Sequence, residues 1–316
     1  MPSCRVLVVE DYEPFRRVIR SILKPRTEFA IIYEASDGLE AIRRAEELQP
    51  DLVLLDIGLP VLNGLEAAIG IRRVAPLARL LFVSQESSSD VIRESFRVGG
   101  QAYIHKARVL SDLVLAIEVV LSGKQFASGA LKLGEGMGAQ AHRHEVLFCS
   151  DDTVLVNGIS EFVAAALQAD KVAIAVVTES HQESVFQRLR VLGVDIQAAT
   201  ERGTYVAVSI DDLLSMFMVD DWPDGDRFSM AADFLIRAAA EHTPGERRPV
   251  VACGECAPAL WIQDKVEATI QLERLLDKLA SGRQIDIFCV YPSLCGREDG
   301  HALKNLCEQH TAVYCQ

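Results

Sequence analysis

The sequence predicts an α/β fold in which a doubly wound parallel sheet is followed by a second, three-layer α/β domain. In the first 121 residues, short apolar runs alternate with stretches of helical periodicity. The run Leu52–Asp56 is apolar on both faces and ends in a carboxylate, which is typical of a strand buried in a parallel sheet. After a glycine-rich segment, the same alternation begins again at His144.

The first half is expected to supply five strands, at Arg5–Val9, Phe29–Glu34, Leu52–Asp56, Arg79–Val83 and Ala102–His105. Pro14 suits the first turn of a helix after the first strand. Further helices are expected at Gly38–Leu48 and Leu110–Leu121, where apolar residues recur at helical spacing. The last of these helices would close a domain that we bound at residues 1–126.

Acidic residues stand where two of these strands end. Glu10 and Asp11 follow the first strand, and Asp56 ends the third. Ligands of open α/β sheets bind outside the carboxyl ends of the strands, so we expect the three carboxylates to converge there. Crowded carboxylates repel one another, and a hard divalent cation such as Mg²⁺ relieves that repulsion. A carboxylate beside Mg²⁺ can attack a phosphoryl group.

Two more strand ends carry polar groups, since Ser84 follows the fourth strand and Lys106 the fifth. With these elements in this order, residues 1–126 resemble a two-component receiver domain, which implies a flavodoxin-like fold. Ala107 stands where many receivers have proline, and with the stretch Gly99–Lys106 it resembles the NarL-type subgroup.

The resemblance implies a metal site and a phosphoacceptor. Asp56 would accept the phosphoryl group. Glu10 and Asp11 would hold Mg²⁺ together with Asp56 and the carbonyl of Gly58. The only chemistry expected of this domain is its own phosphorylation and dephosphorylation.

The resemblance also implies how the phosphorylated state is held and read. Ser84 would contact the phosphoryl group, Lys106 would pair with it, and Tyr103 would be the aromatic switch residue. The donor would be a histidine kinase or a phosphotransfer protein in a two-component phosphorelay.

The bulk composition narrows the function classes. A net charge of −13 disfavours a nucleic-acid surface, which needs a clustered basic footprint. The first residues lead directly into a strand and no apolar run reaches membrane-spanning length, so we expect a cytoplasmic protein without membrane contact. The eight cysteines would then be mostly reduced and buried.

A hinge is expected between the two domains, with the linker at residues 127–141. Five glycines lie between residues 122 and 141, and apolar periodicity is lost after Leu133. A NarL-type regulator would continue into a helix-turn-helix, whereas this chain begins another strand at His144. We therefore expect no direct DNA binding.

The second half alternates again between strands and helices. Strands are expected at His144–Cys149, Val172–Val177, Tyr205–Ile210, Pro249–Cys253 and Asp286–Tyr291. Helices are expected at 159–167, 186–192, 211–217, 226–240, 266–280 and 301–309. The segment Ser150–Gly158 is expected to be a loop, and it has one glycine, no lysine and two acids. A phosphate loop needs glycines and a lysine, so ATP hydrolysis is not expected there.

Residues 142–316 resemble the MEDS domain, a sensory domain named from methanogen and methylotroph regulators. The resemblance rests on blocks at His144, Phe217–Asp224, Gly254–Glu255, Leu272–Glu273, Cys289–Pro292 and Cys307–His310. It implies sensing or protein interaction on a degenerate RecA-like scaffold, with the ligand open. Our candidate site residues in this domain are His144, Glu255, Glu273, Cys289, Tyr291 and His310.

Cysteine and histidine spacing raises a separate hypothesis. The pairs Cys253/Cys256 and Cys307/His310 have the two-residue separation that suits tetrahedral zinc. Cys253 belongs to an apolar strand, where a thiol can simply be buried. A redox role for the Cys253/Cys256 pair is a further hypothesis.

Together these patterns predict a response regulator of unusual output. Phosphorylation of Asp56 would be transmitted to a second domain that binds a small molecule or a signalling protein. The alternative is a receiver coupled to a cryptic enzyme or a nucleotide-binding RecA-like domain, with Glu255 or Glu273 as general base. Whether the chain forms a homodimer is left open.

Overall fold

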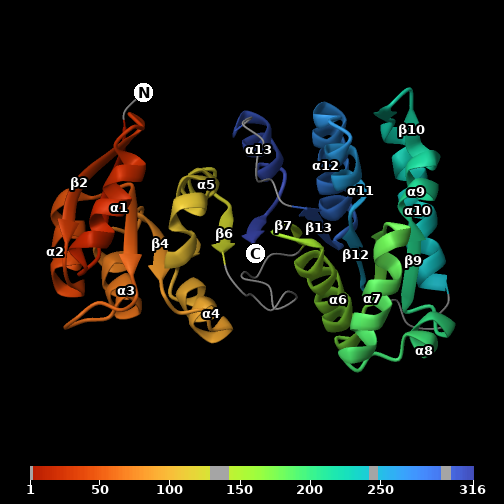
Figure 1. Ribbon diagram of the computed structural model, residues 1–316, viewed down its shortest axis with the longest axis horizontal. Coiled ribbons are helices and arrows are strands. Elements are labelled where there is room, and N and C mark those ends of the chain that lie inside the picture. The colour runs from red at the N-terminus through yellow and green to blue at the C-terminus, as the bar shows by residue number, and fades with distance from the viewer. Residues whose placement is uncertain (1–2, 129–141, 242–247, 293–299) are drawn as a thin grey trace. The chain divides into compact units, whose positions relative to one another are not determined.

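The computed structural model describes residues 3–128, 142–241, 248–292 and 300–316 (Figure 1). The chain divides into two compact units, Met1–Leu131 and Lys132–Gln316. Each unit has a parallel sheet and a buried apolar core of its own. The expected α/β class is therefore confirmed for both halves.

The first unit is a parallel sheet with the strand order β2-β1-β3-β4-β5-β6. Its first five strands have the 2-1-3-4-5 order of a flavodoxin-like doubly wound fold. Its elements are β1 Cys4–Val9, α1 Glu13–Leu23, β2 Phe29–Ala35, α2 Gly38–Leu48, β3 Leu52–Asp56, α3 Gly64–Val74, β4 Arg79–Ser84, α4 Ser89–Arg97, β5 Ala102–His105, the 3₁₀ turn Lys106–Arg108, α5 Val109–Leu121 and β6 Gln125–Ser128.

Short polar residues set where the helices of this unit begin. Asp37 caps α2 by accepting a hydrogen bond from the Glu40 amide at 2.8 Å, and Asn63 caps α3 in the same way through Glu66 at 2.9 Å. A side chain at Gly64 would place its Cβ 1.9 Å from the Asp56 carbonyl oxygen. Glycine therefore lets α3 begin directly against the end of β3.

The first residues of the expected linker form a strand instead. Residues Gln125–Ser128 form β6, which pairs with β5 through Ala102 and Phe126 and through Tyr103 and Ala127. A run of only two apolar residues between glycines gives no strand periodicity, which is why the sequence concealed it. Gly129, Gly134, Gly136 and Gly138 lie outside the described residues.

The second unit is also a parallel sheet, with the order β14-β7-β13-β12-β8-β9. Its elements are β7 His144–Cys149, α6 Asp152–Gln168, β8 Val172–Val177, α7 Glu179–Val191, α8 Ile196–Glu201, β9 Tyr205–Ser209, α9 Ile210–Phe217, the hairpin β10 Met218–Val219 and β11 Trp222–Pro223, α10 Gly225–Glu241, β12 Val250–Gly254, α11 Cys256–Ile262, α12 Val266–Arg283, β13 Asp286–Pro292, α13 Gly300–Cys307 and β14 Ala312–Cys315.

Helices cover both faces of this second sheet. On one face α6 packs over β8, β12 and β13 and contacts α7, and the Phe162 ring stacks on Phe288 at 5.0 Å. Alternate residues of β13 point the other way, where Tyr291 meets Trp261 of α11 edge-on at 6.2 Å. The helices α10, α11 and α12 pack on that side, which completes three layers (Figure 1).

The segment after β7 corrects a prediction. We expected a loop as far as Gly158, but α6 begins at Asp152, and Asp151 caps it by accepting a hydrogen bond from the Val154 amide at 3.0 Å. The polar residues that suggested a loop are the cap and first turn of a helix. The hairpin β10–β11, the helices α8 and α11 and the strand β14 were not predicted.

Candidate functional site

Two acids and one lysine meet at the carboxyl edge of the first sheet. Asp56 ends β3, Glu10 follows β1 and Lys106 follows β5. The two acids are buried, with exposed fractions of 6% and 1%. The Lys106 Nζ lies 2.8 Å from Asp56 Oδ2 and 2.7 Å from Glu10 Oε2. A single ammonium therefore bridges two buried carboxylates.

The electrostatics of this triad favour a positive lysine. Burial would lower the pKa of Lys106, but hydrogen bonds to Asp56 and Glu10 outweigh that effect and the pKa is raised. Burial also raises the pKa of Glu10, against the opposing hydrogen bond from Lys106. The site thus holds more acid than its one cation can fully compensate.

A third acid lies on the solvent side of these two carboxylates. Asp11 is exposed, and one carboxylate oxygen each of Glu10, Asp11 and Asp56 lie within 4.8 Å of one another. The Gly58 amide donates a hydrogen bond to Asp56 Oδ1 at 3.2 Å. The role expected of the Gly58 carbonyl stays a prediction. Three carboxylates with one open side form an oxygen-only donor set that suits a hard divalent cation.

Ser84 and Tyr103 both contact the connection between β4 and α4. Ser84 ends β4, and its Oγ accepts a hydrogen bond from the Glu86 amide at 3.2 Å. The Tyr103 ring is fully buried, and its hydroxyl donates to the Glu86 carbonyl at 2.5 Å. The structure brings these residues to one connection, and their expected roles as phosphoryl contact and switch stay predictions.

In the second unit, five of the six predicted residues lie together. His144 begins β7, Cys289 and Tyr291 lie in β13, Glu273 lies in α12 and His310 precedes β14. His144 pairs with Ile287 in the sheet register, which places it on the same face as Cys289. All five side chains are buried. We call His144, Glu273, Cys289 and His310 the buried donor cluster.

The donor cluster is centred on one oxygen of Glu273. Its Oε2 lies 3.1 Å from His144 Nε2, 3.2 Å from His310 Nε2 and 3.4 Å from Cys289 Sγ. Cys289 Sγ also lies 3.5 Å from His144 Nε2. The other oxygen, Oε1, accepts a hydrogen bond from the Tyr291 hydroxyl at 2.5 Å.

The protonation tendencies of the cluster reflect its burial. Burial would raise the pKa of Glu273, but the two imidazoles outweigh it and the pKa is lowered. Burial would lower the pKa of His144, but Asp277 and Glu273 raise it to about 9. The pKa of His310 is lowered by burial and by the adjacent His144, and burial raises that of the Cys289 thiol.

Glu255 lies apart from this cluster. It follows β12 and is 5% exposed, and its Oε1 and Oε2 lie 2.9 and 3.0 Å from His181 Nδ1. The Thr178 amide donates to Glu255 Oε2 at 3.3 Å. The sequence analysis missed His181, because 74 residues separate it from Glu255 and nothing in the intervening pattern joins them.

The structure does not bring together the two Cys/His pairs of the zinc hypothesis. Cys253 lies in β12, Cys256 begins α11 and Cys307 ends α13. Within the part of the chain that the structure describes, the group of close metal-type donors around His310 contains none of these three cysteines. In this chain, His310 instead meets donors from β7, α12 and β13.

Residues 143–311 match the family described as the methanogen/methylotroph, DcmR sensory domain, or MEDS, and this match covers more than half of the chain. The chain belongs to the MEDS family. Ahead of the MEDS domain, residues 6–118 match the response regulator receiver domain. The receiver domain implies a phosphodonor partner such as a histidine kinase.

Curated relatives of this MEDS protein match its receiver part only. The transcriptional regulatory protein LnrK of Bacillus subtilis is 33% identical over 119 residues, which are 38% of this chain and 54% of LnrK. PdtaR of Mycobacterium tuberculosis is 37% identical over 120 residues, which are 37% of this chain and 57% of PdtaR. The chain thus spans little more than half the length of these relatives.

Solved structures similar to the MEDS protein include a LuxR-family response regulator from Aurantimonas sp. SI85-9A1. It is 32% identical with a TM-score of 0.38, over 40% of this chain and 89% of its own. The response regulator domain of Thermotoga maritima CheB is 32% identical with a TM-score of 0.35, over 37% and 94%. Among the described residues, no helix of the MEDS protein is long and apolar enough to cross a membrane.

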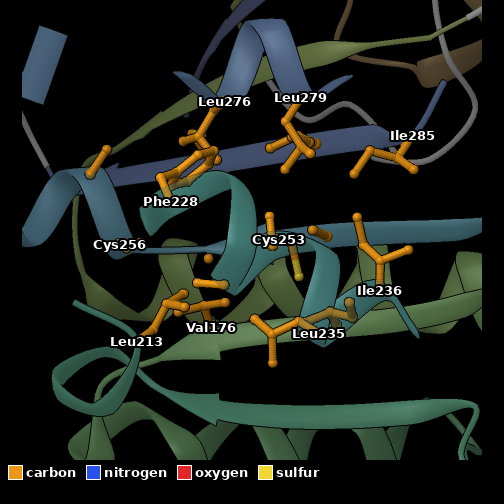
Figure 2. A pocket seen from close by; sticks show the side chains of 18 of the residues that line it. Val176, Leu213, Phe228, Leu235, Ile236, Cys253, Cys256, Leu276, Leu279 and Ile285 are labelled. Atoms are coloured by element: carbon orange, nitrogen blue, oxygen red, sulfur yellow. The ribbon is translucent and has the colours of Figure 1, made fainter. Parts of the chain in front are cut away.

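The MEDS domain also contains an apolar cavity of about 90 Å³. Figure 2 shows Val176, Leu213, Phe228, Leu235 and Leu276 around it, contributed by β8, α9, α10 and α12. Cys289 belongs both to the wall of this cavity and to the buried donor cluster. The cavity and the cluster are therefore neighbours inside one domain.

Proposed function

We propose that this protein is a response regulator in which a histidine kinase or phosphotransfer protein phosphorylates Asp56, and the MEDS domain responds by changing its affinity for a small apolar ligand. The observation that carries the first part is the ammonium of Lys106, held 2.8 Å from Asp56 and 2.7 Å from Glu10 at the carboxyl edge of the sheet. That edge is where open α/β sheets bind their ligands.

The residues of this site divide the work of phosphoryl transfer. Asp56 Oδ attacks phosphorus, a new O–P bond forms and the N–P bond of the phosphohistidine donor breaks. Glu10, Asp11 and Asp56 would hold Mg²⁺, which supplies neutralisation of the phosphoryl oxygens when bound. Lys106 supplies the second positive charge, and Ser84 contacts a phosphoryl oxygen.

The test is phosphorylation of the full chain by a small-molecule phosphodonor in Mg²⁺, read by intact mass. Asp56→Asn should lower incorporation by about 100-fold or more, because the amide is a poor nucleophile. Asp51→Asn is the matched control, since Asp51 accepts a hydrogen bond from the Arg5 amide at the start of β1, away from the site. Undiminished incorporation into Asp56→Asn would remove Asp56 from the mechanism.

The cavity supports a ligand of small size. Apolar cavities stay dry, and one of about 150 Å³ in another protein accommodates benzene. A cavity of about 90 Å³ should therefore take an apolar molecule of only a few heavy atoms, smaller than benzene. Its wall from the sheet and from α9, α10 and α12 offers contact on several sides.

Filling the cavity tests the ligand. Apolar probes of rising size, from dichloromethane to naphthalene, should raise the thermal stability of the MEDS domain only at the small end of the series. Ala232→Leu, on the cavity side of α10, should abolish that shift. Ser229→Leu adds the same side chain on the exposed side of α10 and should retain it. A stabilisation that persists in Ala232→Leu would place the ligand elsewhere.

A second candidate function, a cryptic enzyme, is favoured by the Glu255–His181 pair at the carboxyl edge of the second sheet. His181 would act as base and Glu255 would orient it. A nucleotide substrate is disfavoured, because Asp151 caps α6 and Asp152 begins it where a phosphate would bind. Nucleotide turnover by the MEDS protein that is lost in His181→Gln would contradict that objection and favour this candidate.

The charge and the fold of the second half support a protein without direct DNA contact. The net charge is −13, and the described residues after the receiver fold as a parallel α/β sheet. Tight, salt-sensitive binding of duplex DNA would contradict this part of the proposal.

A further inference from the structure

Both histidines of the buried donor cluster are oriented by backbone carbonyls. His144 Nδ1 lies 3.0 Å from the Gln309 carbonyl oxygen, and His310 Nδ1 lies 2.9 Å from the Leu306 carbonyl oxygen. A carbonyl only accepts hydrogen bonds, so each Nδ1 carries the hydrogen. The other nitrogen, Nε2, is therefore the atom that can bind an ion once any proton on it is released, and both Nε2 atoms face Glu273 Oε2.

One of these two nitrogens has no hydrogen-bond partner. His310 Nε2 is fully buried and 3.2 Å from Glu273 Oε2, yet it makes no hydrogen bond within the described chain. Two acceptors that face each other in a dry interior repel, and a buried polar atom without a partner is costly. A cation between them would satisfy both atoms.

The spacing of the four donors fits a tetrahedral ion. Metal–nitrogen and metal–oxygen bonds of about 2.0 Å and a metal–sulfur bond of about 2.3 Å give tetrahedral edges of about 3.3 Å between N and O and about 3.5 Å from S to N or O. The two N–O edges here are 3.1 and 3.2 Å, and the two edges from sulfur are 3.4 and 3.5 Å.

We propose that His144, Glu273, Cys289 and His310 bind one divalent transition-metal ion, and that the ion is zinc. Two imidazoles, a thiolate and a carboxylate are borderline-soft and hard donors of the kinds that zinc accepts together. All four are buried and all four tetrahedral positions come from the protein, which is the character of a structural site.

The surrounding contacts are those expected around metal ligands. Each histidine donates its Nδ1 hydrogen to a carbonyl, and Glu273 Oε1 accepts from Tyr291 while Oε2 stays directed at the site. A hydrogen bond to its main chain also holds His144 in place, since the Thr311 hydroxyl donates to the His144 carbonyl at 2.9 Å. The ion would join β7, β13, α12 and the start of β14.

The test is the metal content of the full chain, purified without a metal-affinity tag and without chelators, by elemental mass spectrometry. We expect one zinc per chain. Cys289→Ala and His310→Gln should each lower the content at least tenfold, because each removes one of four ligands. Cys149→Ala is the matched control, a buried thiol of β7 outside the donor cluster, and it should keep the metal.

A cobalt measurement guards against loss of metal through misfolding. Refilling the metal-depleted full chain with Co²⁺ should give the visible bands of tetrahedral Co²⁺ and a thiolate charge-transfer band. Cys289→Ser should lose the charge-transfer band while circular dichroism stays native. Another first-row metal at one per chain, lost in Cys289→Ala, would support the site and change only the ion. A native-like chain that holds under a tenth of an equivalent of metal and gives no cobalt spectrum would overturn the proposal.

Discussion

The carboxylates of the receiver edge and the carboxylate of the MEDS donor cluster are held in opposite ways. At the receiver edge, Glu10 and Asp56 share one lysine, and Asp11 beside them is exposed. In the MEDS domain, the single carboxylate of Glu273 is surrounded by two imidazoles and a thiol, all without solvent exposure or nearly so.

This difference indicates whether the ions and groups bound at each site can exchange with solvent. An oxygen-only site that is open on one side suits a hydrated ion and an incoming phosphoryl group, both of which must come and go. A closed site with nitrogen, sulfur and oxygen donors suits an ion that stays bound and stabilises the fold. Under our two proposals, the protein separates an exchangeable metal site for signalling from a permanent one for structure.

Metal removal should give the largest contrast between the two domains. Dialysis against a strong chelator should lower the unfolding free energy of the MEDS domain by about 4 kcal/mol, the effect of an ion present at about 1,000 times its Kd. Loss of Mg²⁺ should cost the receiver only about 1 kcal/mol in a buffer whose free Mg²⁺ concentration is about five times the Kd of the site. Urea unfolding in matched buffers measures both effects.

The readouts for the two domains can be separated. Both tryptophans, Trp222 and Trp261, lie in the MEDS domain, and Trp261 meets Tyr291 beside the donor cluster, so tryptophan fluorescence follows that domain alone. Hydrogen exchange of the receiver strands follows the other domain. Equal effects of chelation on the two domains, or none on the MEDS domain, would contradict the contrast.

Removing Lys106 should reveal the excess negative charge of the receiver site. Lys106→Met leaves Asp56 and Glu10 buried without a cation, which costs about 3–5 kcal/mol in a closed interior. The open side lets water in, so we expect about 2 kcal/mol in chelator. Mg²⁺ should restore more stability to this variant than to the native chain, as urea unfolding with and without Mg²⁺ would show.

The matched control for that variant is Lys24→Met, which removes an exposed ammonium from the end of α1. Its stability should not depend on Mg²⁺ more than the native chain does. If Lys106→Met is as stable as the native chain in chelator, the lysine does not neutralise the two acids.

The fold was largely predictable because buried parallel strands leave an unmistakable pattern. Leu52–Leu55 and Val172–Val177 are uninterrupted apolar runs, and both lie in fully buried strands. β6 was missed because it has only two apolar residues, a run too short to indicate a strand. Its pairing with β5 is what shows that it is a strand. The start of α6 was missed because Asp151 and Asp152 favour both turns and helix caps.

The sequence predicts the geometry of the receiver site better than that of the donor cluster, and the reason is physical. Glu10, Asp56 and Lys106 each follow a strand, so the topology of a parallel sheet places them at one edge. The donor cluster depends instead on which face of α12 carries Glu273 and on the register of β7 with β13. No local spacing encodes that register, which is why the spacing of Cys307 and His310 suggested a different set of metal ligands.

The smallest effect on stability is expected at an ordinary ion-pair cluster of the MEDS domain. Asp286 lies 3.1 Å from Arg143 and 3.0 Å from Lys171, and although burial would raise its pKa, these cations lower it below the usual 3.8. A depressed folded-state pKa adds stability above 3.8, and this stability is lost as the pH falls through the folded-state value. Asp286→Asn should therefore cost about 1 kcal/mol at pH 7 and progressively less below pH 4. Urea unfolding from pH 3 to 7 tests this, with Asp170→Asn, an exposed partner of Arg248, expected to show no such trend; a cost that does not change with pH would assign the effect of Asp286 to packing rather than to charge.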